Sequence, residues 1–202
     1  MRFRHLPELA ARAIVLPPAY AVMRVLFDLT LKGTRHIPAE GPGIVVANHA
    51  GFLDPFLLQA ATHRPLRFLM TSDFFDMKAQ QWFYRFVRAI RVNENGPPRD
   101  SIRGALDVLK ASGLVGLFPE GQLSPDGNLS PLQPGISFLA SRSKVPVVPA
   151  WIDGSYHVCR RGQLFPRRHR LTVTCGAPFT IESPRDRSTP ERILAAWDEL
   201  RG

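Results

Sequence analysis

The chain has 202 residues, of which 45% are hydrophobic and 21% are charged; these proportions fit one globular domain and exclude disorder as its general state. It carries 26 lysine and arginine residues against 17 acidic ones, for a formal net charge of +9, so we expect an anionic partner. Nucleic acid and an anionic membrane face both fit, because each presents dense phosphate. Two cysteines, Cys159 and Cys175, are too few for a disulfide framework and predict a reduced, intracellular setting.

Apolar residues dominate positions 6–31, although four charged side chains, Glu8, Arg12, Arg24 and Asp28, interrupt them and a proline pair at 17–18 divides them. The longest stretch without a charge, 13–23, has 11 residues, well short of the roughly 20 that a spanning helix needs. We therefore predict two short amphipathic helices over 1–32 that lie in a membrane interface rather than cross it. A helical hairpin packed on the domain core explains the same pattern equally well.

From residue 33 onward, short β-branched runs alternate with helical stretches, a pattern typical of α/β domains. The predicted strands are 43–47, 66–70, 89–92, 114–118, 145–152 and 171–175. The predicted helices are 55–61, 79–87, 99–111, 135–142 and a last helix that begins near Ser188 or Thr189 with Pro190 in its first turn. The fold expected over 33–202 is a single α/β domain whose mixed sheet has about six or seven strands flanked by helices, preceded by the N-terminal helical pair.

The segment Asn48-His49-Ala50-Gly51-Phe52-Leu53-Asp54 lies directly after one predicted strand and directly before a helix, where open α/β sheets place ligand sites. His49 is the side chain best suited to take a proton near neutral pH, and Asp54 is placed to hold its other ring nitrogen. Taken alone, the residues also fit a structural histidine and an aspartate that caps the helix before Pro55. A second motif is needed to decide between these interpretations.

That second motif is Phe118-Pro119-Glu120-Gly121, which leaves another apolar strand and places Glu120 at the same sheet edge as His49. An Asn-His-x-x-x-x-Asp block followed 71 residues later by Phe-Pro-Glu-Gly resembles the glycerolipid acyltransferases of the lysophosphatidate acyltransferase type. The stretches 145–150 and 173–178 resemble the fourth block and the closing strand of that family. The resemblance thus covers residues 33–180 in the family's order.

The resemblance implies an O-acyltransferase that moves a fatty acyl group from acyl-coenzyme A or acyl carrier protein to the free hydroxyl of a lysophospholipid. The expected acceptor is 1-acylglycerol-3-phosphate, in phospholipid synthesis, and neither a cofactor nor a metal ion is implied. His49 would be the general base and Asp54 would orient it and stabilise its charge, without an acyl-enzyme. The residues expected to bind substrate are Asn48, Phe118, Pro119, Glu120, Gly121 and Arg91.

Two departures from the family pattern affect the acceptor. The family's second block carries an arginine where this chain has Asn93 or Glu94, and its third block continues Gly-Thr-Arg-Ser where this chain has Gln122-Leu123 after Gly121. Arg91, Arg99 or Arg103 would replace the missing guanidinium groups, since a neighbouring position can reach the same phosphate. The alternative is an acceptor that carries a headgroup, such as lyso-phosphatidylethanolamine.

The basic stretch around Arg160-Arg161 and Arg167 to Arg170 is interpreted either as a solvated charge run or as a surface for phospholipid headgroups or acyl carrier protein. A nucleic-acid-binding module is a remote alternative, because the chain has no helix-turn-helix, zinc-finger or RNP pattern. The location expected is cytoplasmic and peripheral to the inner membrane face, with an anionic membrane surface as a partner and no nucleic acid.

Overall fold

A computed structural model describes residues 24–25, 27–71, 89–92, 99–158, 168–183, 186 and 188–202. The helices in this part of the chain are η1 (Thr34–His36), α2 (Asp54–Ala60), α5 (Arg99–Lys110), α6 (Gly135–Ser143), α7 (Ser155–Val158) and α8 (Thr189–Arg201). The strands are β1 (Leu29–Lys32), β2 (Gly43–Ala47), β3 (Leu66–Thr71), β4 (Ile90–Val92), β5 (Leu114–Leu117), β6 (Val147–Asp153) and β7 (Leu171–Cys175). The predicted helix 79–87 lies outside the described residues.

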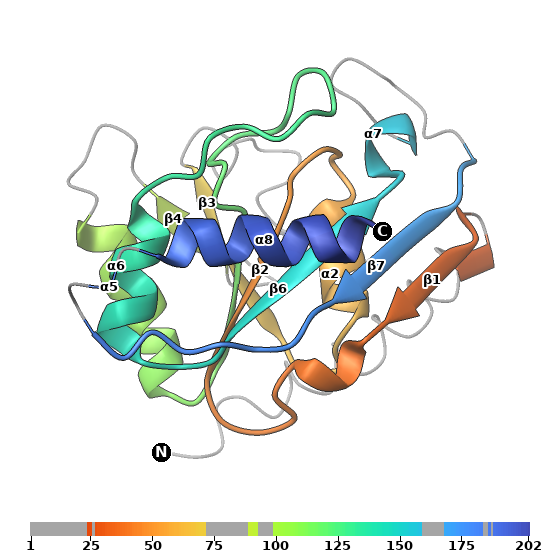
Figure 1. The fold of residues 1–202 in the computed structure, drawn as a ribbon. Coiled ribbons are helices and arrows are strands. Elements are labelled where there is room, and N and C mark those ends of the chain that lie inside the picture. The colour runs from red at the N-terminus through yellow and green to blue at the C-terminus, as the bar shows by residue number, and fades with distance from the viewer. Residues whose placement is uncertain are drawn as a thin grey trace.

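The described strands form a seven-stranded sheet in the order β1-β7-β6-β2-β5-β3-β4 (Figure 1). Neighbours are parallel except β6 and β7, which run antiparallel. The mixed sheet and the α/β class are therefore as predicted. The central strand β2 is buried along its whole length, because helices cover both faces of the sheet.

Alternate residues of β2 divide the core into two layers, since successive side chains of a strand point to opposite faces. Val45 and Ala47 pack in a cluster with the buried leucines of α2. Ile44 and Val46 belong to a second cluster with apolar residues of α5, α6 and α8, in which Trp197 is fully buried. Figure 1 shows α8 lying across one face of the sheet while α2 lies behind the other.

One element differs from the prediction in kind. The segment Leu29–Lys32, expected at the end of the N-terminal helical pair, is the edge strand β1 and pairs in parallel with β7. Its burial alternates between buried or half-buried leucines and exposed Thr30 and Lys32, which is the two-residue period of a strand. The sheet thus begins before residue 33. Residues 1–23, where most of the predicted helical pair falls, lie outside the described residues.

Because of the strand directions, several chain segments meet at one edge of the sheet, the edge where β2 ends. The parallel strands β2, β5 and β6 end there, and β7 begins there because it runs antiparallel to β6. β1 begins at this edge as well, because it is parallel to β7. The short helix α7 follows β6 at the same edge. In the part of the chain that the structure describes, no helix meets the length and hydropathy needed to cross a bilayer.

Candidate active site

The turn between β2 and α2 holds the predicted histidine and aspartate together. Asp54 is the first residue of α2 and its side chain is 0% exposed. Its Oδ2 accepts hydrogen bonds from His49 Nδ1 at 2.9 Å, from the Ala50 N–H at 2.7 Å and from the Gly51 N–H at 2.8 Å. A helix cap accepts from N–H groups that follow it, whereas these donors precede Asp54. The carboxylate therefore closes the turn around His49 and does not cap α2.

The geometry of the pair determines which ring nitrogen of His49 is available. An ionised carboxylate only accepts hydrogen bonds, so Nδ1 carries the proton donated to Asp54, and Nε2 of the neutral ring is left as the acceptor. The His49 side chain is 20% exposed whereas that of Asp54 is fully buried. The imidazole is thus reachable from outside and its orienting carboxylate is not.

Two phenylalanine rings fix the plane of the imidazole. The His49 ring stacks on Phe118 with the ring centroids 4.2 Å apart and the planes 19° apart. Phe118 in turn stacks on Phe68 of β3, with a centroid distance of 5.8 Å. Gly116 in β5 makes room for this stack, because a Cβ there would overlap the Phe68 ring. Stacking and the bond to Asp54 together restrain both the plane and the rotation of the His49 ring.

Glu120 holds the main chain of His49. Its carboxylate is 2% exposed, with Oε1 accepting from the His49 N–H at 2.7 Å and Oε2 from the Ser130 N–H at 2.8 Å. Burial raises the pKa of Glu120 above its usual value, and these two N–H donors oppose that rise. The Ser124 N–H donates to the His49 carbonyl at 2.8 Å. The loop after β5 therefore binds both the N–H and the carbonyl group of His49.

The remaining predicted site residues are placed as follows. The Asn48 amide is buried and bonds the Ile152 backbone in both directions, at 3.0 and 2.7 Å, which ties the end of β2 to β6. Pro119 is buried beside Glu120. Gly121 is exposed and has a φ of 74°, which favours glycine. Arg91 lies on β4 opposite Met70, and its side chain is outside the described part. Roles in substrate binding stay predictions for all of these residues.

The acyltransferase family model matches residues 28–153, which is more than half of the chain and includes both motifs. The chain belongs to the acyltransferase family.

Relatives of this acyltransferase occur in plants and bacteria. It is 23% identical over 166 residues to a 1-acyl-sn-glycerol-3-phosphate acyltransferase of Bacillus subtilis, covering 82% of this chain and 80% of the relative. It is 26% identical over 139 residues to a chloroplastic 1-acyl-sn-glycerol-3-phosphate acyltransferase of Brassica napus, covering 67% of this chain. The match spans only 40% of that plant protein.

A solved structure shares the fold. The crystal structure of PlsC, the 1-acyl-sn-glycerophosphate acyltransferase of Thermotoga maritima, superposes with a TM-score of 0.78 and covers 100% of this chain and 84% of that one. The two chains are 23% identical, so the likeness establishes the architecture of this acyltransferase and not its substrate.

Sequence reasoning missed two supports of His49, helix α7 and Phe68. Helix α7 packs on the His49 turn so closely that a Cβ on Gly51 would lie 2.6 Å from the Ser155 carbonyl oxygen. The Ser155 hydroxyl is buried there with no hydrogen-bond partner. No local signal in the sequence marks the four-residue helix that packs against Gly51. Phe68 was also missed, although Gly116 in a strand interior is a signal for close approach.

Several residues bear on the two departures from the family pattern. Leu123 occupies the position of the family's third-block arginine and is half-buried, and Gln122 before it is exposed. Arg103 is exposed on α5, and the side chain of Arg99 is outside the described part. Among the described residues, no group of three or more histidine, cysteine, aspartate or glutamate side chains is placed to hold a metal ion.

Proposed function

We propose that this acyltransferase moves a fatty acyl group from acyl-coenzyme A or acyl carrier protein to the free hydroxyl of a lysophospholipid in phospholipid synthesis. The observation that carries the proposal is the 2.9 Å bond between His49 Nδ1 and Asp54 Oδ2, which leaves Nε2 as a proton acceptor on an accessible ring. The relatives named above support 1-acylglycerol-3-phosphate as the acceptor. The acceptor is a membrane lipid, so we place the protein at the cytoplasmic face of a membrane.

The reaction follows from this geometry. Nε2 of His49 takes the proton of the acceptor hydroxyl while the hydroxyl oxygen attacks the thioester carbonyl carbon. The new C–O bond forms the ester, the C–S bond breaks as the tetrahedral intermediate collapses, and the imidazolium returns the proton to the leaving thiolate. Asp54 stabilises the transient imidazolium. His49 acts as a base and not as a nucleophile, so no acyl-enzyme forms.

The hydrogen bonds within the turn hold the Asp54 carboxylate in the orientation that catalysis needs. The Ala50 and Gly51 N–H groups hold Oδ2 in place before substrate arrives, so the carboxylate needs no rearrangement when His49 becomes charged. Glu120 and Phe118 fix the backbone and the ring plane of His49 from the other side. These two residues of the second motif are therefore proposed to position the base as well as to shape the substrate site.

A headgroup-bearing acceptor such as lyso-phosphatidylethanolamine is the second candidate. The observation that favours it is the uncharged, half-buried Leu123 where the family has an arginine, because a phosphomonoester gains more from a guanidinium than a phosphodiester does. The two acceptors are separated by comparing kcat/KM for each of them with the same acyl donor.

The test is an acyl-transfer assay of the native protein, His49→Ala and the control His63→Ala, which changes an exposed histidine beyond α2. With lysophosphatidate or lyso-phosphatidylethanolamine in mixed micelles, we expect His49→Ala to lose roughly 10² to 10⁴ in kcat, as loss of a general base does, and His63→Ala to keep native activity. Native protein that acylates neither lipid, or a His49→Ala variant that stays fully active, would contradict the proposal.

A further inference from the structure

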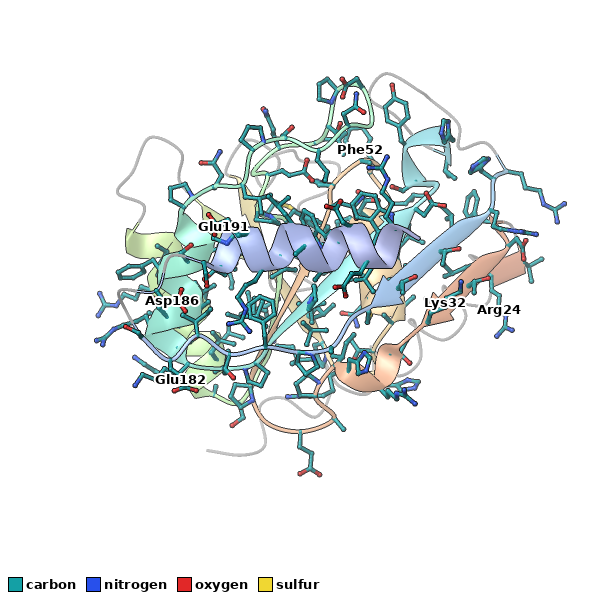
Figure 2. The ribbon with its side chains drawn as sticks, in the orientation of Figure 1. Arg24, Lys32, Phe52, Glu182, Asp186 and Glu191 are labelled. Atoms are coloured by element: carbon teal, nitrogen blue, oxygen red, sulfur yellow. The ribbon has the colours of Figure 1, made fainter. Side chains whose placement is uncertain are left out.

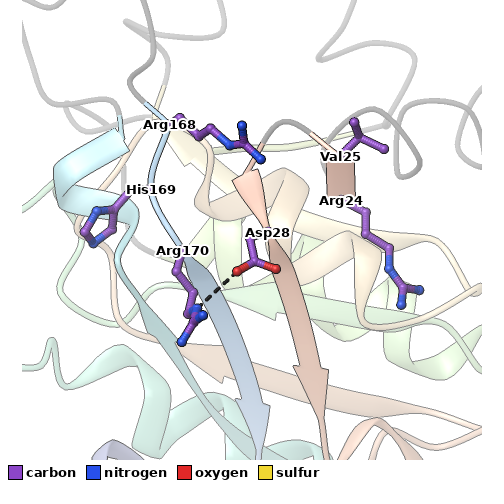
Figure 3. A pocket seen from close by; sticks show the side chains of 6 residues that line it. All are labelled: Arg24, Val25, Asp28, Arg168, His169 and Arg170. Carbon is purple, nitrogen blue, oxygen red and sulfur yellow. Dashed lines mark hydrogen bonds and ion pairs between the residues drawn. The ribbon is translucent and has the colours of Figure 1, made fainter.

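A hollow opens between the beginnings of β1 and β7, away from His49. Its volume is about 620 Å³. Figure 3 shows the side chains that line it: Arg24, Val25, Asp28, Arg168, His169 and Arg170. All six residues are exposed, so a ligand larger than the hollow can reach them.

The hollow has an excess of positive charge. Asp28 is the only carboxylate among the six lining residues, and it pairs with Arg170, whose Nε lies 3.1 Å from its Oδ2. The charges of Arg24 and Arg168 are therefore not balanced within the hollow. Guanidinium groups bind phosphate through paired hydrogen bonds, so the chemistry of the hollow suits a phosphate group.

The hollow lies on the same edge of the sheet as His49. The register pairs Ala47 at the end of β2 with Ala150, Asp153 at the end of β6 with Thr172, and Leu171 with Leu29. Adjacent strands are about 4.8 Å apart, so β1 and β2, three strands apart, are separated by roughly 14 Å. One flat surface can thus contact the hollow and the active site together.

Helix α7 forms the physical link between the two places. At one end, the Ser155 backbone presses on Gly51 of the His49 turn. At the other, the ring of His157 lies 5.0 Å, centroid to centroid, from that of His169 in the wall of the hollow. One short helix thus contacts both the turn that carries His49 and the wall of the hollow.

Exposed apolar side chains on this edge indicate which kind of anionic partner the hollow binds. Val25, inside the hollow, is 73% exposed, and Phe52 and Phe56 next to the His49 turn are 40% and 39% exposed. Figure 2 shows Phe52 at the loop end of the sheet and Arg24 beside β1. Arginine beside exposed apolar side chains suits a lipid interface, where the cations meet phosphate and the apolar groups leave water. Nucleic acid offers no such apolar layer.

We propose that the hollow of Arg24, Arg168 and Arg170 binds the phosphate of anionic phospholipid headgroups and sets the His49 edge against the membrane surface. The proposal deepens the proposed function, because it gives the enzyme a route to a membrane-borne acceptor. Binding to vesicles is measured without any acyl donor, so a failure of the catalytic proposal leaves this test intact.

The experiment compares two double variants with equal charge change. Arg24→Gln/Arg168→Gln removes the unbalanced charges of the hollow. Arg35→Gln/Arg142→Gln is the control, because both arginines are exposed and lie away from the His49 edge. Arg35 is in η1, after the end of β1, and Arg142 is in the last turn of α6, before β6 begins. Binding is measured by co-sedimentation with phosphatidylcholine vesicles, with and without about 30% phosphatidylglycerol.

We expect the hollow variant to bind the anionic vesicles roughly 25-fold more weakly than native protein, since each basic residue at such a surface contributes about fivefold. The reduction in binding for the control variant should be less than half as large on a logarithmic scale. Both variants should acylate a short-chain, water-soluble acceptor at the native rate. Equal binding by the two variants would overturn the proposal. So would a loss of the same size on neutral vesicles, or a loss seen with acyl carrier protein or RNA but not with vesicles.

Discussion

Two aspartates at one edge of the sheet are built in opposite ways. Asp54 is 0% exposed and its Oδ2 accepts three hydrogen bonds, whereas Asp28 is 62% exposed and pairs with an Arg170 that is 78% exposed. Removing a buried group leaves its partners unpaired, while water and salt screen the exposed pair. The properties of the His49 turn therefore depend on the exact positions of its atoms, whereas those of the hollow beside β1 depend on how many charges it carries.

The difference matches the two tasks proposed for this edge. Proton transfer requires a base within hydrogen-bond reach of its substrate in one orientation, and the contacts of His49 to Asp54, Glu120 and Phe118 provide it. Attraction to a charged surface tolerates many orientations. Side chains that are free to rearrange, as exposed arginines are, suit that second task.

The largest effect is expected for Asp54→Asn, with Asp28→Asn as the matched control. An amide cannot carry the negative charge that stabilises the imidazolium. We expect kcat to fall roughly 10³-fold or more, while Asp28→Asn acylates a water-soluble acceptor at the native rate and unfolds with a free energy within about 1 kcal/mol of native. Equal kcat values for the two variants would contradict the statement that Asp54, and not Asp28, supports catalysis.

A smaller effect is expected for Gly51→Ala. The new Cβ would lie 2.6 Å from the Ser155 carbonyl oxygen, so α7 or the His49 turn must shift. We expect the free energy of unfolding to fall by about 1–3 kcal/mol and kcat to fall with it. Denaturant unfolding and steady-state kinetics measure both effects.

The control for Gly51→Ala is Gly135→Ala, since a Cβ at Gly135 meets nothing within 4 Å. This variant should be as stable as native protein or slightly more so, because alanine favours a helix. If Gly51→Ala behaved like Gly135→Ala, the turn would be more compliant than its packing against α7 indicates.

The smallest effect is a pH dependence at Glu120. Burial raises the pKa of this carboxyl in the folded protein, so its ionisation opposes folding. Its stabilising contribution is complete below the pKa of the unfolded chain and is lost as the pH rises through the folded value. We expect the unfolding free energy of native protein relative to Glu120→Gln to increase as the pH falls from 7 towards 5. The control Glu182→Gln, at an exposed glutamate, should show no such trend, and a trend of opposite sign for Glu120 would contradict the assignment.

Much of the fold was predictable because its signals are local. The strand at Gly43–Ala47 and the strand at Leu171–Cys175 were predicted with their observed bounds, since an apolar or alternating run carries its period within a few residues. The pairing of His49 with Asp54 was predictable for a similar reason, because the two residues lie five positions apart on one turn. Local periodicity did not predict β1, whose leucines continue an apolar run that also suits a helix.

The sequence by itself determined the α/β class, the two motifs at strand ends and the residue types needed for proton transfer. The tertiary structure alone decided that β1 pairs with β7, that Asn48 bonds Ile152 at a separation of 104 residues, and that Glu120 holds His49 at a separation of 71. The physical reason is that the spacing of apolar residues, which distinguishes a helix from a strand, involves only residues that are close together in the sequence. The partner of a buried donor depends instead on the order and direction of strands, which the chain settles only when the whole sheet assembles.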